Sequence, residues 1–300
     1  MTDRYLGLDL GGTNIKVAVL EKGEGGFQVV STSRTRTGSE GGPGAVTDNL
    51  VAAAREALEV EPEIASIGLG VPGLFDRDRG TIELFPNLPG DWAGYPLRSR
   101  LEQELGREIW MVNDARAFTL AEGTMGAGAG CHIVVCVTLG TGVGGGIMID
   151  GRLHGGAFGV AGELGHQTIV PDGPLCGCGN RGCVEALTRA DVLTSLAGKE
   201  TAEEVYSAAG AGEEKSLAAI RQVAEYLGIG LANVVTLLGP DRIIIGGGIA
   251  DAGELVLGPI REAVRARVTL VPIEQIDVVA ASLGAVAGAL GAALAGVLRP

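Results

Sequence analysis

One pattern occurs twice in this sequence: an apolar run, a glycine turn and a second apolar run. The first copy, Asp9-Leu-Gly-Gly-Thr-Asn14, follows the run that starts at Tyr5. The second copy, Thr138-Leu-Gly-Thr-Gly-Val143, lies at the end of the β-branched run His132–Leu139. Apolar runs interrupted by a glycine turn predict strand–turn–strand hairpins. Because the hairpin recurs within 300 residues, we expect two related α/β domains.

Strands and helices are expected in a similar order after each hairpin. The expected strands are Tyr5–Leu10, Ile15–Leu20, Phe27–Thr32, Ile64–Leu69, Ile109–Val112, His132–Leu139, Gly145–Ile149, Arg242–Ile245 and Ile276–Ala280. The expected helices are Ala45–Leu58, Leu97–Leu105, one from Asp114, Ala218–Leu238, one from Ala252 and a final helix rich in Ala and Gly. We expect residues 1–113 to form a smaller domain, onto which a C-terminal helix of about 284–300 packs. Residues 114–283 would form a larger domain that carries a cysteine-rich loop.

Charge and composition exclude several classes of partner. The chain has 23 Lys and Arg residues against 36 Asp and Glu residues, a net charge of −13. Nucleic acids and anionic membranes attract a basic face, so neither is an expected partner. Val278–Leu298 is uncharged but consists mostly of Ala and Gly, which predicts a packed interior helix rather than a membrane span. No apolar leader follows Thr2, so a cytoplasmic protein is expected.

Three glycine turns follow strands, at residues 11–12, 140–146 and 246–248. Backbone N–H groups without side-chain obstruction suit anionic phosphates. Each turn alone is equally compatible with an ordinary hairpin or strand end, but three in this order favour a nucleotide site. Asp9 directly precedes the first turn, where a carboxylate either holds Mg²⁺ through water or caps the turn.

Neither of two familiar nucleotide-binding motifs is complete in this sequence. Gly68-Leu-Gly-Val-Pro-Gly73 has dinucleotide-binding spacing, but proline and turn residues replace the helix that a pyrophosphate would need. The chain has no Walker A sequence either, since Glu200 follows its only Gly-Lys pair.

The segment Cys176-Gly-Cys178-Gly-Asn-Arg-Gly-Cys183 places three thiols in a glycine-rich loop after His166. Three Cys and one His complete a tetrahedral Zn²⁺ site with no open position, which predicts a structural zinc ion. Free thiols or a disulfide are the alternatives. Cys131 and Cys136 belong to an apolar strand and are expected to act as small core residues.

His166 also has a second ring nitrogen, which zinc binding would hold in a fixed direction. Glu163 precedes this histidine by one helical turn, and Glu185 follows the last cysteine of the cluster. An oriented imidazole with two carboxylates suits a ligand that has several hydroxyl groups. Alternatively, Glu185 is a first-turn helix residue that the helix dipole favours.

Asn113 and Asp114 end an expected strand and begin a helix. Either residue could simply be the helix N-cap, which stabilises a helix by about 1 kcal/mol. Ligands of α/β domains usually bind at the carboxyl ends of strands, however, so a carboxylate at this position could accept a proton from an attacking hydroxyl.

The chain resembles the ROK family (repressors, open reading frames and sugar kinases) over essentially its whole length. The motifs that carry the resemblance are Asp9-Leu-Gly-Gly-Thr13, Asn113-Asp114, Gly140-Thr-Gly-Val-Gly-Gly-Gly146, Glu163-Leu-Gly-His166 and Cys176-x-Cys-Gly-x-x-Gly-Cys183-x-Glu185. The resemblance implies an actin-like, ribonuclease-H-like α/β fold of two domains with a central cleft and a zinc-binding loop.

It also implies a role for each matching residue. ATP and Mg²⁺ would contact Asp9, Gly11, Gly12, Thr13, Thr138, Gly140, Thr141, Gly142, Gly246, Gly247 and Gly248. A hexose would contact Gly73, Asn87, Asn113, Glu163, His166 and Glu185, with Asp114 as catalytic base. Zinc would bind His166, Cys176, Cys178 and Cys183. Many family members have Lys where this chain has Asn14, and Lys16, on the same strand face, is the candidate replacement.

The implied activity is transfer of the γ-phosphoryl group of ATP to a hexose, with O6 of glucose as the leading acceptor. Mannose, allose and N-acetylhexosamines are alternative acceptors, and polyphosphate or ADP are alternative donors. A sugar-sensing regulator that lost catalysis, or an actin-like ATPase, would use the same fold. The family also implies a homodimer or homotetramer.

Overall fold

The computed structural model describes residues 3–86, 88–248 and 252–299, and it consists of two compact units. Unit 1 comprises Met1–Met125 together with Leu283–Pro300, and unit 2 comprises Gly126–Ser282. The expected boundary at residues 113 and 114 lies before α3 (Asp114–Met125), whereas the structure assigns this helix to unit 1. The reason is packing: α3 lies against α9 (Ala287–Leu298), the C-terminal helix of the same unit.

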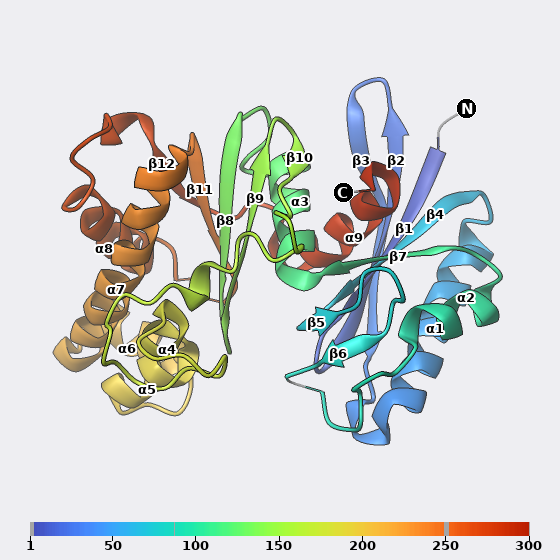
Figure 1. Ribbon diagram of the computed structural model, residues 1–300, viewed down its shortest axis with the longest axis horizontal. Helices are drawn as coiled ribbons and strands as arrows, with labels where there is room; N and C mark the ends of the chain where they lie inside the picture. The colour runs from blue at the N-terminus through green and yellow to red at the C-terminus, as the bar shows by residue number, and fades with distance from the viewer. Residues whose placement is uncertain (1–2, 87, 249–251, 300) are drawn as a thin grey trace. The chain divides into compact units, whose positions relative to one another are not determined.

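Unit 1 is built on a five-stranded sheet with the order β3-β2-β1-β4-β7 (Figure 1). The strands are β1 (Asp3–Leu10), β2 (Asn14–Gly23), β3 (Gly26–Arg36), β4 (Ile64–Val71) and β7 (Ile109–Asn113). The first three form the expected antiparallel meander, and β4 and β7 then pair in parallel with β1 and with each other. The carboxyl ends of β1, β4 and β7 therefore lie at one edge of the sheet, where ligands of such folds bind.

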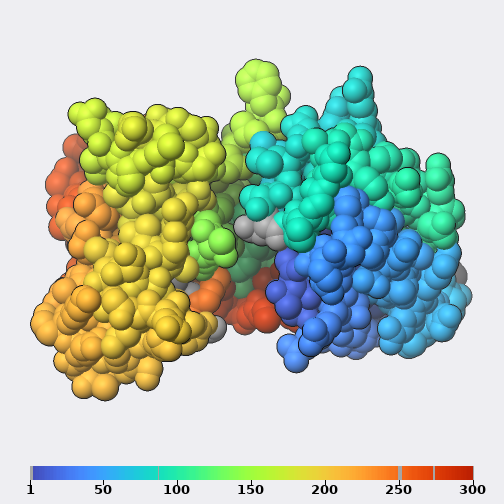
Figure 2. Space-filling model, turned by 90° about the horizontal axis from the view of Figure 1, so that it is seen from below, coloured from blue at the N-terminus to red at the C-terminus, as the bar shows by residue number. Residues whose placement is uncertain are grey.

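Helices cover both faces of this sheet. Helix α1 (Gly42–Val60) packs on the face that carries Leu6 and Leu8, and α2 (Leu97–Leu105) lies beside α1 on the surface of the unit (Figure 2). Helix α9 packs on the opposite face, where Gly7 and Gly68 let its backbone approach the strands. A methyl group on Gly68 would lie 1.7 Å from the carbonyl oxygen of Ala292, so only glycine fits there.

The C-terminal helix is thus an interior element, as its small residues predicted. Its buried residues run from Ala287 to Gly296 with little interruption. Among the described residues, no helix combines the length and the apolar character that a membrane crossing requires.

The segment with dinucleotide-binding spacing does not lead into a helix. Gly68 and Gly70 lie within β4, and Gly73, with φ +74°, turns the chain into a small antiparallel hairpin. This hairpin consists of β5 (Leu74–Phe75) and β6 (Ile82–Leu84). A hairpin therefore stands where a dinucleotide-binding segment would have a helix, as the proline and turn residues predicted.

Unit 2 repeats the topology of unit 1. Its sheet has the order β10-β9-β8-β11-β12, so that both sheets, numbered within their own units, have the order 3-2-1-4-5. The strands are β8 (Ile133–Leu139), β9 (Val143–Ile149), β10 (Arg152–Leu153), β11 (Arg242–Gly246) and β12 (Asp277–Ala280). The core lies between this sheet and a helical layer. The helices are α4 (Val184–Thr188), α5 (Ala190–Ala197), α6 (Ala202–Gly210), α7 (Glu214–Leu238) and α8 (Glu254–Arg265).

The chain leaves unit 1 after Met125 and returns to it at Leu283. One side chain joins these two points, because the carboxylate of Glu122 accepts a hydrogen bond of 2.8 Å from the Leu283 N–H. Glu122 is fully buried.

Candidate functional site

The first glycine turn is exposed at its tip and fixed at its base. Gly12 and Thr13 are exposed, while the Gly11 N–H donates to the carbonyl of Asn14. Thr37 comes from beyond β3 and binds the turn twice: its hydroxyl donates to the Gly11 carbonyl at 2.7 Å and its N–H to the Thr13 carbonyl at 2.9 Å. Thr37 is fully buried, and because it is distant from the turn along the chain, no local sequence pattern predicts this role.

Asp9 lies at the end of β1 with only 8% of its surface exposed. Burial raises the pKa of its carboxyl group, and Lys16, whose Nζ is 3.7 Å from Oδ2, opposes that shift. Two glycines make room for the carboxylate, since a methyl group on Gly288 would lie 2.5 Å from Oδ2 and one on Gly70 would lie 3.4 Å from Oδ1. Within the described part of the chain, no turn N–H donates to the Asp9 carboxylate, which leaves the hypothesis of a turn-capping aspartate without support.

At the end of β7, Asn113 has two functions at once. Its Oδ1 accepts the N–H groups of Ala115 and Arg116, at 3.1 and 3.3 Å, which is the bonding of a helix N-cap. Its Nδ2 donates to the Gly73 carbonyl at 3.2 Å, so the cap also fixes the turn after β4. The adjacent Asp114 is exposed in the first turn of α3. Asn87 lies outside the described residues.

In unit 2, the second and third glycine turns lie side by side. Gly246 pairs with Thr138 at the carboxyl ends of β11 and β8. Gly247, with φ +86°, then passes so close to β8 that a methyl group on it would lie 2.1 Å from the Leu139 carbonyl oxygen. Gly140 and Thr141 continue from the same strand end. The predicted phosphate-binding turns of unit 2 therefore share one edge of its sheet.

Glu185 connects the second turn to the cysteine loop. One carboxylate oxygen, Oε2, accepts the Val143 N–H at 2.9 Å, and the other, Oε1, accepts the Cys176 thiol at 3.5 Å. Oε2 also occupies the space beside Gly142, where a methyl group would lie 2.7 Å from it. Glu185 lies in the first turn of α4, as the alternative based on the helix dipole predicts. It also contacts the second glycine turn, which the helix dipole does not explain.

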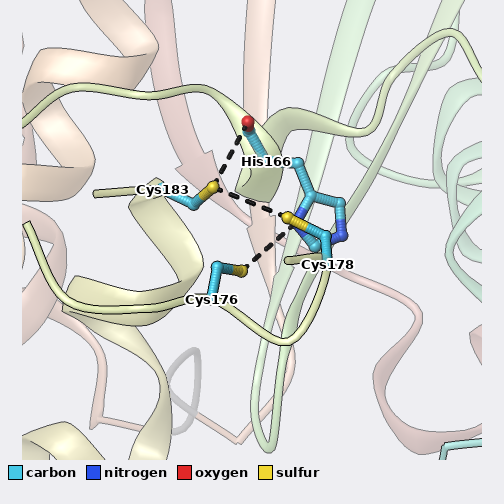
Figure 3. A group of neighbouring side chains, drawn as sticks. All are labelled: His166, Cys176, Cys178 and Cys183. Atoms are coloured by element: carbon cyan, nitrogen blue, oxygen red, sulfur yellow. Dashed lines mark hydrogen bonds between the residues drawn. The ribbon is translucent and has the colours of Figure 1, made fainter. Parts of the chain in front are cut away.

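The four expected zinc ligands converge in the structure (Figure 3). One ligand atom from each of His166, Cys176, Cys178 and Cys183 lies within 4.8 Å of all the others. All three thiols are free, and the sulfur atoms of Cys178 and Cys183 are 3.8 Å apart, so the disulfide alternative does not describe this loop. A Cys₃His set of this size can hold a metal ion with closed tetrahedral coordination.

A close backbone contact within the cysteine loop requires glycine. Gly182, with φ +64°, lies so close to Val170 that a methyl group would come within 1.6 Å of its carbonyl oxygen. Burial raises the pKa of the Cys176 thiol to about 12, whereas the Asn180 N–H lowers the pKa of Cys178. A divalent cation favours the thiolate form of such ligands.

His166 presents its two ring nitrogens to different groups. Nδ1 lies 3.6 Å from the Cys176 sulfur, and Nε2 lies 3.9 Å from the Glu163 carboxylate. Gly165 allows this placement because it presses against β9, where a methyl group would lie 2.1 Å from the Val143 carbonyl oxygen. One nitrogen thus faces the cysteines and the other faces a carboxylate, beside the second glycine turn.

Comparison with known proteins agrees with this fold. The ROK family model matches residues 5–296. A glucokinase of Streptomyces coelicolor is 38% identical over 312 residues, covering 96% of each chain. The structure of a ROK family glucokinase from Streptomyces griseus in complex with glucose and AMPPNP superposes with a TM-score of 0.83, at 35% identity, over 99% of this chain and 100% of that chain. A xylose repressor of Caldicellulosiruptor bescii is 34% identical over 73% of this chain, which corresponds to 59% of the repressor.

The repeated α/β units and the glycine turns define an actin-like ATPase fold. The chain belongs to the ROK family.

Proposed function

We propose that this sugar kinase transfers the γ-phosphoryl group of ATP to O6 of glucose. The observation that carries the proposal is the arrangement in unit 2, where hydroxyl-binding groups adjoin a phosphate-binding turn. Glu163 and His166 lie next to β9, and Glu185 holds the N–H of Val143 at the start of that strand. A polyol held there has its hydroxyl groups near a site for phosphates.

Sugar recognition would use the fixed imidazole. Since Nδ1 of His166 is directed at the cysteines, Nε2 is available to a sugar hydroxyl together with the Glu163 carboxylate. Within unit 1, the Asn113 amide and the Gly73 backbone are the groups that would bind a sugar hydroxyl, and Asn87 is a further candidate for this role. These groups donate and accept hydrogen bonds, as a hexose requires.

Asp114 would be the catalytic base. It follows the N-cap Asn113, so its position is fixed by the start of α3, and its exposed carboxylate can accept the proton of the attacking hydroxyl. Phosphoryl transfer has a loose transition state, so orienting the hydroxyl is the larger part of this role.

Each unit has a turn that would bind phosphate oxygens: the exposed turn at Gly12 and Thr13 in unit 1, and the turn from Gly140 to Gly142 in unit 2. Asp9 would hold Mg²⁺ through water, and the ion, when bound, neutralises charge on the phosphates. The Cys₃His set would hold a structural Zn²⁺ ion that fixes the loop and His166.

The test is coupled ADP release with Mg-ATP and a panel of glucose, mannose, allose and N-acetylglucosamine. We expect glucose to give the highest kcat/KM. ATP hydrolysis that no hexose accelerates would overturn the kinase proposal, and preference for another hexose would overturn the glucose assignment alone. The same panel with polyphosphate or ADP in place of ATP tests the donor.

The xylose repressor relative supports a second candidate, a sugar-binding regulator without catalysis. Calorimetry separates the two candidates, because a regulator would bind a sugar tightly and would not bind AMPPNP. The exposed Asp114 and the accessible first glycine turn favour the kinase.

A further inference from the structure

Three cations lie close together on one face of β2 and β3, beside the first glycine turn. Lys16 of β2 pairs in register with Asp9 on one side and with Arg34 of β3 on the other, and Asn14 pairs with Arg36. Residues opposite one another on antiparallel strands share a face, as do residues two apart on one strand. We call Lys16, Arg34 and Arg36 the cation row.

This face is open at the outer edge of the sheet. The opposite face of β2 carries Ile15 and Val17, which are buried in the core under α1. On the face of the cation row, α9 packs against β1, β4 and part of β2, where Ala18 is buried, and it meets Asp9 at Gly288. The outermost strand, β3, is exposed along nearly its whole length.

The two arginines have no counter-ion within the described part of the chain. Among the described residues, the side chains of Arg34 and Arg36 make no hydrogen bond or ion pair, and Lys16 reaches only Asp9, at 3.7 Å. The next pair along the same face, Ala18 and Thr32, is uncharged. In a chain with a net charge of −13, unpaired cations beside a buried carboxylate point to an anionic ligand.

The row also adjoins the exposed turn. Asn14, opposite Arg36, follows Thr13 directly, and Thr37, which follows Arg36, binds both ends of the turn. Adjacent strands are about 4.8 Å apart, so Asp9, Lys16 and Arg34 follow one another across the sheet at intervals of this order, and Arg36 lies two residues further along β3, nearer the turn. A guanidinium group can donate two parallel hydrogen bonds to two oxygens of one phosphate group.

We propose that the cation row is a subsite for a chain of linked phosphates, which starts at the first glycine turn and continues over Lys16 on β2 and Arg34 and Arg36 on the edge strand β3. The proposal rests on the proposed kinase function and adds Arg34 and Arg36 as residues that bind the phosphoryl donor. Linked phosphates occur both in nucleoside triphosphates and in inorganic polyphosphate, so the test must separate these two sources.

The test compares the wild type with a double variant, Arg34→Gln with Arg36→Gln. The control is Lys22→Gln with Arg152→Gln. It removes the same charge from two exposed positions outside the cation row, one on β2 and one on β10. Calorimetry measures binding of Mg-AMPPNP, inorganic tripolyphosphate and glucose, and steady-state kinetics measure kcat and KM for Mg-ATP.

We expect the double variant to weaken tripolyphosphate binding about two- to tenfold, the range for losing two exposed ionic contacts. Its kcat and its affinity for glucose should match those of the control. A parallel increase in the Kd of AMPPNP and in the KM for ATP assigns the row to the nucleotide, whereas an effect on tripolyphosphate alone assigns it to an inorganic chain.

Failure of this inference is distinct from failure of the proposed function. A wild type that phosphorylates glucose, with a double variant equal to the control for every phosphate ligand, overturns the subsite and leaves the kinase. A wild type that neither binds AMPPNP nor phosphorylates a sugar overturns the kinase. In that case, weaker tripolyphosphate binding by the double variant alone would still support the subsite.

Discussion

Asp114 is the residue on which the proposed chemistry depends most. Replacing it with Asn keeps an oxygen that can accept the Ala115 N–H, now at 2.8 Å from Oδ1, but removes the proton acceptor. We expect Asp114→Asn to lower kcat about 10²- to 10⁴-fold, the usual contribution of a general base, with little change in glucose affinity. Coupled ADP release and calorimetry measure the two quantities.

The matched control is Asp48→Asn, which changes an exposed aspartate on α1. It should leave kcat unchanged. A near-normal rate for Asp114→Asn would contradict its assignment as the base, and another carboxylate would then have to be sought.

Gly68 is required by packing rather than by chemistry. A methyl group there would lie 1.7 Å from the carbonyl oxygen of Ala292, so Gly68→Ala has to push α9 away from β4. We expect a loss of about 3 kcal/mol in the free energy of unfolding, at the upper end for an overpacked core. Gly44→Ala on α1, where a methyl group meets nothing within 4 Å, should change stability by less than about 1 kcal/mol, in the stabilising direction. Urea unfolding tests both variants, and equal midpoints would contradict the packing argument.

The sequence predicts those site residues that can be identified from the residues next to them in the chain. The four metal ligands could be found because their spacing and residue types alone suggest zinc, and Asp9 because it ends a strand before a glycine turn. Thr37, Gly288 and Glu122 could not be found in this way. Each acts through a partner distant in sequence, and nothing in its own neighbourhood marks it.

At the scale of elements, the cysteine loop depends on its ligands more than on a core of its own. Its small buried cluster comprises Cys176, Cys183 and Ala186. We expect about one zinc ion per chain by elemental analysis, and we expect its removal by a chelator to increase hydrogen exchange between residues 164 and 188. Glucose affinity should fall as well, because His166 loses its fixed orientation.

Cys183→Ser should reproduce the loss of metal, whereas Cys131→Ser, which lies outside the cluster, should retain it. Protein purified without chelator that contains no metal, and that does not take up added zinc, would contradict the assignment.

The periodicity of apolar residues in the sequence predicts most strands and long helices, but it does not predict two groups of elements. The β5–β6 hairpin lies in a segment rich in Pro and Gly, which composition alone describes as irregular. Helices α5 and α6 are short, and the burial that stabilises them comes from α7, so their own sequences carry a weak signal.

At the scale of the whole molecule, unit 1 is discontinuous and unit 2 is not. Residues 126–282 contain a complete sheet and their own core, so we expect this segment to fold alone and to unfold cooperatively on heating. Residues 1–125 alone should aggregate, because without α9 the sheet face with Gly7 and Gly68 is uncovered.

A short linker from residue 125 to residue 283 should restore unit 1, since Glu122 binds the Leu283 N–H and the two chain ends are therefore close. Circular dichroism and size-exclusion chromatography test all three proteins. A soluble, folded 1–125 segment would contradict the requirement for α9. The domain boundary could not be located from sequence for the same reason, because α3 is assigned to unit 1 by its contact with α9.

The position of α9 at the end of the chain also affects folding during synthesis. The strands of unit 1 leave the ribosome first, but the helix that covers them follows only after residues 126–282. At about 5–20 residues per second, the sheet waits on the order of ten to thirty seconds for its last element. During translation the second unit can therefore complete its fold before the first, and the half-covered nascent sheet is a natural substrate for chaperones.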